Sequence, residues 1–111
     1  MTVKEITDKL GLKVYTEGVT LEGQVKGGYV SDLLSDVMGH ASEGEVWITL
    51  QSHLNVLAIA SLKEISAVVL VKGIRPDEQV ITKAEKEGIP ILTAPGPAFE
   101  IVGKIYRILN D

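Results

Sequence analysis

The chain has 111 residues, the length of one domain, and we expect residues 1–111 to fold as a single unit. It contains no cysteine, which excludes a disulfide framework, a cysteine zinc site and thiol catalysis. Its net charge is −4 and its basic residues are scattered along the sequence, so we expect no nucleic-acid partner.

The N-terminal residues carry signals for a helix and a strand. Thr2 and Glu5 have the spacing of a capping box, which predicts a helix. Gly11 suits the left-handed conformation that ends such a helix. Residues 12–16 then alternate apolar and polar side chains and predict a short strand.

The next stretch is less regular and contains several glycines. Residues 24–30 predict an irregular strand that Gly27-Gly28 breaks. Ser31-Asp32 has the side chains of a helix start. The apolar stripe of that helix is expected to consist of Leu33, Leu34, Val37, Met38 and Ala41.

The second half of the chain alternates strands and helices. Residues 45–50 (EVWITL) predict the clearest strand, in which Trp47 is expected to lie in the core or in an interface, and Ser52 is placed to cap the helix that follows. Residues 67–71 (AVVLV) form a continuous apolar run, which is typical of a strand buried on both faces of a parallel sheet. A third strand is expected over 89–92, and helices over 53–64, 77–87 and 97–109.

This alternation predicts an α/β fold, a three-layer domain with a mainly parallel sheet and helices on both faces. In such a sheet, ligands bind beyond the carboxyl ends of the strands, next to helix N-termini that attract anions. We therefore predict a site there for a small anionic ligand, a nucleotide or a phosphorylated metabolite. A plainer interpretation stays open, in which Ser31 and Ser52 are only helix caps, and Lys72 and Arg75 are only solvated loop charges. The predicted ligand-binding residues are Gln51, Ser52, His53, Lys72, Gly73, Arg75 and Thr93.

Catalytic, metal and cofactor signatures are missing from the sequence. Gly18 and Gly23 have the glycine spacing of a P-loop, but Gln24-Val25 follows where Lys and Ser or Thr are needed. His40 and His53 lack metal-ligand spacing. We therefore expect no catalytic residue, no metal site and no cofactor.

Long segments of the chain resemble the DRTGG domain family, namely VWITLQSHLNVLAIASLKEISAVVLVKGIRPDEQV and EGIPILTAPGPAFEIVGKIY. The segments TVKEITDKLGLKVYT and VKGGYVSDLLSDVMGHA are similar to the same family, so the resemblance covers nearly the whole chain. It is closest to short stand-alone DRTGG proteins that are labelled as similar to the N-terminal domain of HPr serine kinase. The family is named for Asp-Arg after one strand and Thr-Gly-Gly after the next. Gln51-Ser52-His53 and Val71-Lys72-Gly73 occupy these positions here, and only Gly73 matches.

The resemblance implies a regulatory or adaptor role. In larger proteins the family's domain lies beside CBS modules in certain pyrophosphatases, or beside a phosphotransacetylase domain, where it is thought to regulate and to help form dimers. We therefore expect a homodimer that takes a small anionic ligand or a protein as a further partner. The kinase of HPr kinase lies in a separate domain with a P-loop, so the resemblance implies no kinase activity for this chain.

Composition and the final helix also favour a homodimer. The hydrophobic share is 45%, and the final helix is apolar nearly all round, which makes it the leading candidate for the interface.

The alternative function is a small enzyme for a phosphorylated metabolite, with His53 as acid/base and Lys72 or Arg75 as phosphate clamp. With no signal peptide, and no apolar run near the roughly 18 residues of a membrane helix, we expect a cytoplasmic protein without membrane contact.

Overall fold

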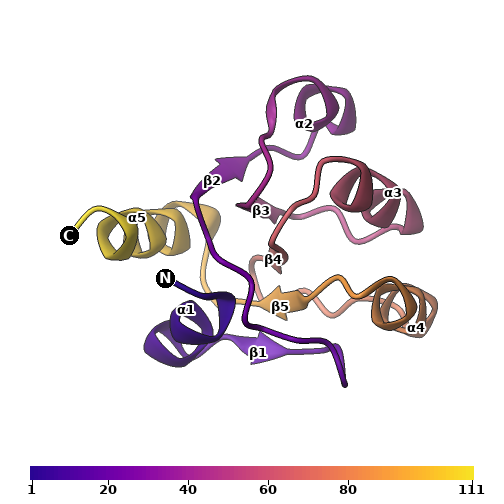
Figure 1. Ribbon diagram of the computed structural model, residues 1–111, viewed down its shortest axis with the longest axis horizontal. Helices are drawn as coiled ribbons and strands as arrows, with labels where there is room; N and C mark the ends of the chain where they lie inside the picture. The colour runs from indigo at the N-terminus through magenta and orange to yellow at the C-terminus, as the bar shows by residue number, and fades with distance from the viewer.

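The computed structural model describes residues 1–111 and places five strands in one sheet, in the order β1-β5-β4-β3-β2 (Figure 1). Strands β2 to β5 run parallel, and β1 pairs with β5 in the antiparallel sense. The predicted strands 45–50, 67–71 and 89–92 are therefore confirmed as parallel neighbours. The strands are β1 (Lys13–Val14), β2 (Gly27–Val30), β3 (Glu45–Thr49), β4 (Ala67–Leu70) and β5 (Ile91–Thr93).

Five helices cover the two faces of this sheet, which confirms the three-layer α/β fold (Figure 1). Two helices, α1 (Val3–Leu10) and α5 (Ala98–Leu109), pack on one face. The other face carries α2 (Leu34–His40), α3 (Leu54–Leu62) and α4 (Glu78–Glu87). The longest of these helices has 12 residues, and none has the length and hydropathy that a membrane crossing needs.

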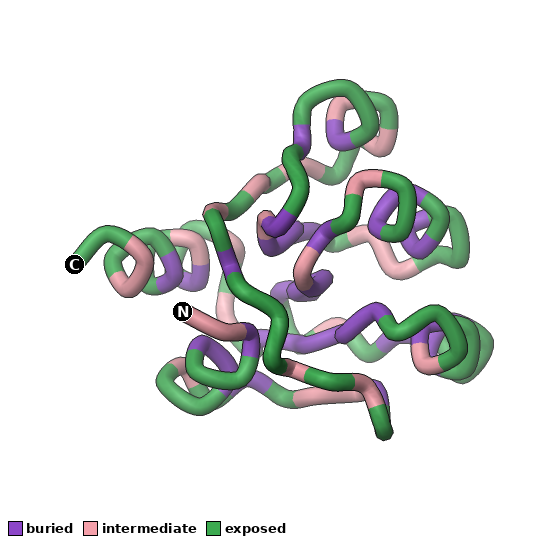
Figure 2. The backbone as a smooth tube through the Cα atoms, in the orientation of Figure 1, coloured by how far each residue is buried: buried purple, intermediate pink, exposed green.

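The central strands supply both hydrophobic cores, because their side chains alternate between the two faces. Trp47 and Val68 pack under α2, α3 and α4, whereas Val46 and Val69 pack under α1 and α5. In Figure 2, β4 is buried along its whole length and β3 is buried from Val46 onward. Trp47 is fully buried, and its indole Nε1 donates to the Ser31 carbonyl at 2.9 Å, so the prediction that it lies in the core is confirmed.

Local signals in the sequence account for several helix ends. The Thr2 hydroxyl accepts from the Glu5 N–H at 3.1 Å, and the Glu5 carboxylate accepts from the Thr2 N–H at 3.0 Å. This predicted capping box lowers the pKa of Glu5, chiefly through the bond to the Thr2 backbone. Gly11 ends α1 and Gly88 ends α4, both with the left-handed backbone that glycine adopts without strain.

Three predicted boundaries were wrong. Gly27-Gly28 does not break a strand but forms the first half of β2, because its backbone pairs with β3. The helix after it begins at Leu34 rather than at Ser31-Asp32, since the Asp32 side chain bonds to β3 instead of capping. The last strand spans Ile91–Thr93 rather than 89–92.

Two details of the predicted helices also differ from the structure. Leu33 and Met38, expected in the apolar stripe of α2, are exposed. The N-cap of α3 is His53 rather than Ser52, and no side chain caps this helix.

Candidate functional site

The four parallel strands end at one edge of the sheet, which we call the carboxyl edge. The loop after β3 holds Gln51, Ser52 and His53, and the loop after β4 holds Lys72, Gly73 and Arg75. Thr93 is the last residue of β5. The pairing of β3 with β4 and of β4 with β5 thus brings all seven predicted residues to neighbouring positions along this edge.

Asp32 ties the loop after β2 to the loop after β3. Its Oδ1 accepts from the Thr49 hydroxyl at 2.8 Å and from the Leu50 N–H at 2.7 Å. The Gln51 side-chain amide donates to the Asp32 carbonyl at 2.9 Å. Gln51 therefore fixes the loops instead of presenting a free amide to a ligand, and Asp32 is an organising residue that the predicted set omitted.

The loops after β4 and β5 are joined in a similar way. The Lys72 N–H donates to the Gly96 carbonyl and the Gly73 N–H to the Ala94 carbonyl, both at 2.8 Å. The hydroxyl of Thr93, a buried side chain, donates to the Ile74 carbonyl at 2.8 Å. Thr93 is therefore a structural residue of this edge, whereas the Lys72 side chain is left exposed above it.

Arg75 is held to one side of the edge. Its guanidinium donates to the Glu78 carboxylate at 3.0 Å and lies 5.6 Å from the centre of the Tyr15 ring, which comes from the segment after β1. Lys13 lies 4.9 Å from the same ring. Arg75 thus shares its charge with Glu78 and Tyr15. Lys72, the other predicted cation of this edge, has no ion-pair partner.

Ser52 and His53 stand at the open N-terminus of α3. His53 is exposed, and its ring makes no hydrogen bond within the chain. Because no side chain caps α3, its first backbone N–H groups are available to an anion. With Lys72 on the next loop, this end of the sheet combines an uncapped helix N-terminus with an exposed cation.

Large apolar side chains are exposed around the same loops. Leu33 is 64% exposed before α2, and Leu50 and Leu54 are exposed at the entry to α3. Phe99, in the first turn of α5, is 90% exposed. Four of the eight large apolar side chains that the chain exposes therefore border the carboxyl edge. The predicted set missed them, although Leu33, next to the helix-start residues Ser31-Asp32, was a signal in the sequence.

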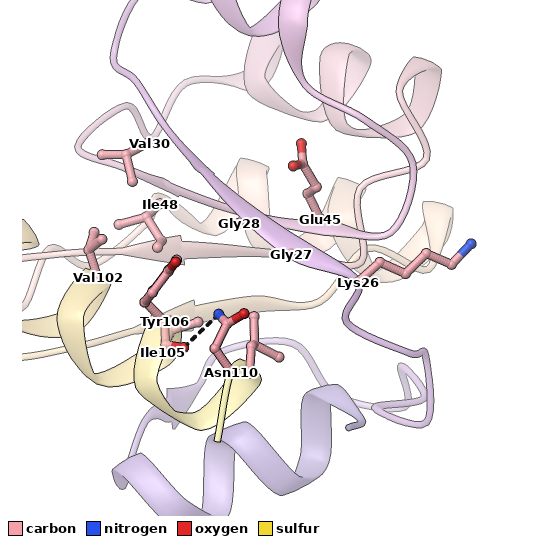
Figure 3. A pocket seen from close by; sticks show the side chains of 11 residues that line it. Lys26, Gly27, Gly28, Val30, Glu45, Ile48, Val102, Ile105, Tyr106 and Asn110 are labelled. Carbon is pink, nitrogen blue, oxygen red and sulfur yellow. Dashed lines mark hydrogen bonds between the residues drawn. The ribbon is translucent and has the colours of Figure 1, made fainter.

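A groove lies elsewhere on the surface, between α5 and the edge strand β2 (Figure 3). This α5–β2 groove has a volume of about 330 Å³. It is lined by Lys26, Gly27, Gly28, Val30, Glu45, Ile48, Val102, Ile105, Tyr106, Leu109 and Asn110. Of the predicted carboxyl-edge residues, Arg75 lines a further hollow, together with Tyr15, Glu17 and Glu78.

A second polar cluster, on β2 and α2, connects these elements. The Tyr29 hydroxyl donates to Asp36 Oδ2 at 2.9 Å, and His40 Nδ1 lies 3.2 Å from Asp36 Oδ1. The bond from Tyr29 lowers the pKa of Asp36, and the same bond raises the pKa of Tyr29. Nowhere in the chain do three or more metal-ligating side chains converge.

Comparison with known proteins establishes the family. A family model described as the DRTGG domain matches residues 5–108. The chain belongs to the DRTGG domain family. This confirms the resemblance seen in the sequence, and no curated protein matches the chain significantly.

A solved structure has the same fold as this DRTGG domain. It comprises the CBS and DRTGG domains of the regulatory region of Clostridium perfringens pyrophosphatase, complexed with its activator diadenosine tetraphosphate. The TM-score is 0.67 at 20% sequence identity, over 91% of this chain and 46% of that one. This DRTGG domain thus spans about half the length of that structure.

The segment that the sequence resemblance aligns with the family's Thr-Gly-Gly motif has an unusual backbone in this DRTGG domain. Lys72 and Gly73 are both left-handed, with φ of 59° and 65°. Two successive left-handed residues suit a pair of glycines, because other residues lose about 1–2 kcal/mol each in this conformation. Lys72 thus occupies a position that favours glycine, and it brings a cation to the carboxyl edge.

Proposed function

We propose that this DRTGG domain is a regulatory or adaptor module that binds an anionic ligand at the carboxyl edge and acts as a homodimer. One observation carries the proposal. The unpaired Lys72, the open N-terminus of α3 and exposed apolar side chains share one surface. Such a surface suits a ligand with a phosphate group and an apolar or aromatic part, and a nucleotide has both.

The clostridial structure supports a nucleotide as the ligand class. The regulatory region of that pyrophosphatase contains a DRTGG domain and binds diadenosine tetraphosphate as an activator. A regulatory role also agrees with a carboxyl edge whose loops are fixed by hydrogen bonds. We expect binding there to change how the domain contacts a partner, without chemical change of the ligand.

The alternative, an enzyme with His53 as acid/base, has less support. A catalytic histidine needs a second group that orients its ring and sets its proton affinity. The ring of His53 is exposed and has no such hydrogen-bond partner in the chain, while Arg75, the second proposed phosphate clamp, is engaged by Glu78. We therefore propose no catalytic residue.

Thermal unfolding in the presence of nucleotides tests the ligand. Diadenosine tetraphosphate, ATP and pyrophosphate are added separately to the full chain, because a ligand of the native state raises its stability. At 100 times the dissociation constant the gain is about 2.7 kcal/mol, which corresponds to roughly 10 °C or more for a domain of this size. If none of the three raises the melting temperature, nucleotide binding is rejected.

Lys72→Asn locates the site, since asparagine tolerates the left-handed backbone and replaces the charged ammonium with a short neutral amide. A charged hydrogen bond is worth about 1.5–3 kcal/mol, so we expect at least a tenfold loss of nucleotide affinity by calorimetry. Lys83→Asn, on the exposed side of α4, is the matched control and leaves the affinity unchanged. Equal affinities in the Lys72 variant and the wild type would move the site away from this edge.

A further inference from the structure

The edge strand β2 (Gly27–Val30) is open along its whole outer side. It pairs with β3 on one side and is last in the strand order, so no strand lies on its other side. Such an edge presents unpaired backbone N–H and C=O groups, which are a template for another strand. The two residues on one face of β2, Gly28 and Val30, are both exposed.

The α5 side of β2 is also incompletely covered. Gly28 faces this side, next to Val46, but contributes no side chain. Val30 faces the same side and is 48% exposed. Between them and α5 lies the α5–β2 groove, over which Tyr106, 69% exposed, points toward the strand (Figure 3). A groove with six hydrophobic residues among its eleven, beside an unpaired strand edge, is a candidate surface for another molecule.

We propose that β2 pairs antiparallel with β2 of a second copy of this chain, about a two-fold axis that passes beside Tyr29. The two five-stranded sheets then become one continuous sheet, and the two α5 helices lie on the same face of it. The inference rests on the proposed homodimer and names its interface.

In this register, the side chains of β2 in one copy are complementary to those of β2 in the other copy. Residue 30 of one copy lies opposite residue 28 of the other, so each exposed Val30 enters the space that Gly28 leaves empty on the α5 side. At the ends of the strand, Lys26 of one copy lies opposite Asp32 of the other. Both are exposed and of opposite sign, and each also has a partner in its own chain, Glu43 for Lys26 and Thr49 for Asp32. Tyr29 does not obstruct the pairing, since its hydroxyl is bonded to Asp36 on the other face of the sheet.

This self-complementarity is the reason to name a second copy as the occupant. A two-fold axis forms every contact twice, so one strand must carry both halves of each contact. β2 and its flanking residues do so, with Gly28 and Val30 for shape and Lys26 and Asp32 for charge. Pairing with a strand of an unrelated protein would not require β2 to be complementary to itself.

Light scattering on the full chain is the first test. We expect the wild type to have the mass of two chains, and Val30→Asp to have the mass of one with an unchanged circular dichroism spectrum. Leu62→Asp is the matched control, because Leu62 is 66% exposed at the far end of α3, and we expect it to stay dimeric. A dimeric Val30→Asp variant overturns the interface but leaves homodimerisation intact. A monomeric wild type rejects both.

Cysteine cross-linking tests the register, because the chain has no cysteine of its own. Residues directly opposite in an antiparallel pair lie within disulfide range, whereas diagonal neighbours lie about 7–8 Å apart and outside it. An equimolar mixture of Gly28→Cys and Val30→Cys chains should therefore form a disulfide-linked dimer on oxidation, and either variant alone should not. No link in the mixture, or an equal link in Val30→Cys alone, overturns the register.

Discussion

Lys72 combines backbone strain with an exposed charge at a single residue. Its φ of 59° lies in the left-handed region, where side chains other than glycine are disfavoured. The hydrogen bonds from the N–H groups of Lys72 and Gly73 to the loop after β5 hold this conformation in place. Strain of this kind persists where the surrounding structure enforces it, and it is often associated with binding sites.

Replacing Lys72 by glycine should therefore stabilise the fold. Relief of about 1–2 kcal/mol of strain exceeds the roughly 0.5–1 kcal/mol that the freer unfolded glycine costs, so we expect a gain of up to about 1 kcal/mol in urea unfolding. The same change at Lys83, inside α4, should lose about 1 kcal/mol. A stability loss at both positions would show that Lys72 is not strained.

Asp36 makes part of the stability depend on pH. Its pKa is lowered in the folded state, chiefly by the hydrogen bond from Tyr29, so its contribution is complete above the ordinary carboxylate pKa of about 4. That contribution is lost as the pH falls through the lower, folded-state value. We therefore expect Asp36→Asn to lower the melting temperature at pH 7 and to reduce the drop between pH 7 and pH 3.

A suitable control for this pH dependence is Asp77→Asn. Asp77 is the N-cap of α4 and makes no side-chain hydrogen bond there, so its replacement should leave the drop between pH 7 and pH 3 almost unchanged. If Asp36→Asn and Asp77→Asn showed the same drop, the bond between Tyr29 and Asp36 would not be the source of the effect.

At the scale of helices, replacing two glycines by alanine should change the stability in opposite directions, although the space around both is equally free. A Cβ atom added at Gly88 or at Gly103 meets nothing within 4 Å, so only the backbone conformation differs. Gly88 ends α4 with φ of 71°, and alanine there should cost about 1–2 kcal/mol.

Gly103 lies inside α5, where alanine should add about 0.5–1 kcal/mol. Thermal or urea unfolding of the two single variants measures the contrast. If both variants were more stable, or both less stable, than the wild type, one of these two backbone conformations would be wrong.

The sequence predicts those elements whose signals are local. The apolar runs of β3 and β4 and the capping box of α1 are complete within a few neighbouring residues, and the predictions made from them are confirmed. The start of α2 depends on a contact across the sheet, from Asp32 to Thr49, which neighbouring residues do not reveal.

The candidate site shows the same limit. Topology alone places the predicted residues at the carboxyl edge, but hydrogen bonds between loops decide which of them are free. Gln51 and Thr93 are used to join loops, and Arg75 is drawn toward Glu78 and Tyr15. The sequence offers no signal for these pairings, because the partners are brought together only by the fold.

At the scale of the whole molecule, the carboxyl edge and the β2 edge are separate surfaces that share one strand end. Val30 is the last residue of β2, and Asp32, two residues later, organises the loops of the carboxyl edge. A ligand that orders these loops would therefore act on the segment that flanks the proposed dimer contact. For the proposed regulatory function, this connection is a short path between the ligand site and the dimer contact.

The other end of the sheet differs from the β2 edge, and this difference limits how far the assembly can extend. β1 has only two residues and carries the exposed Lys13. A short edge strand with a lysine disfavours pairing with a further strand. The proposed pairing through β2 occupies the longer of the two edges of the sheet, so we expect no third molecule to join by strand pairing. Filaments need two compatible ends on every subunit, so for the proposed dimer we expect a mass of two chains that does not grow with protein concentration.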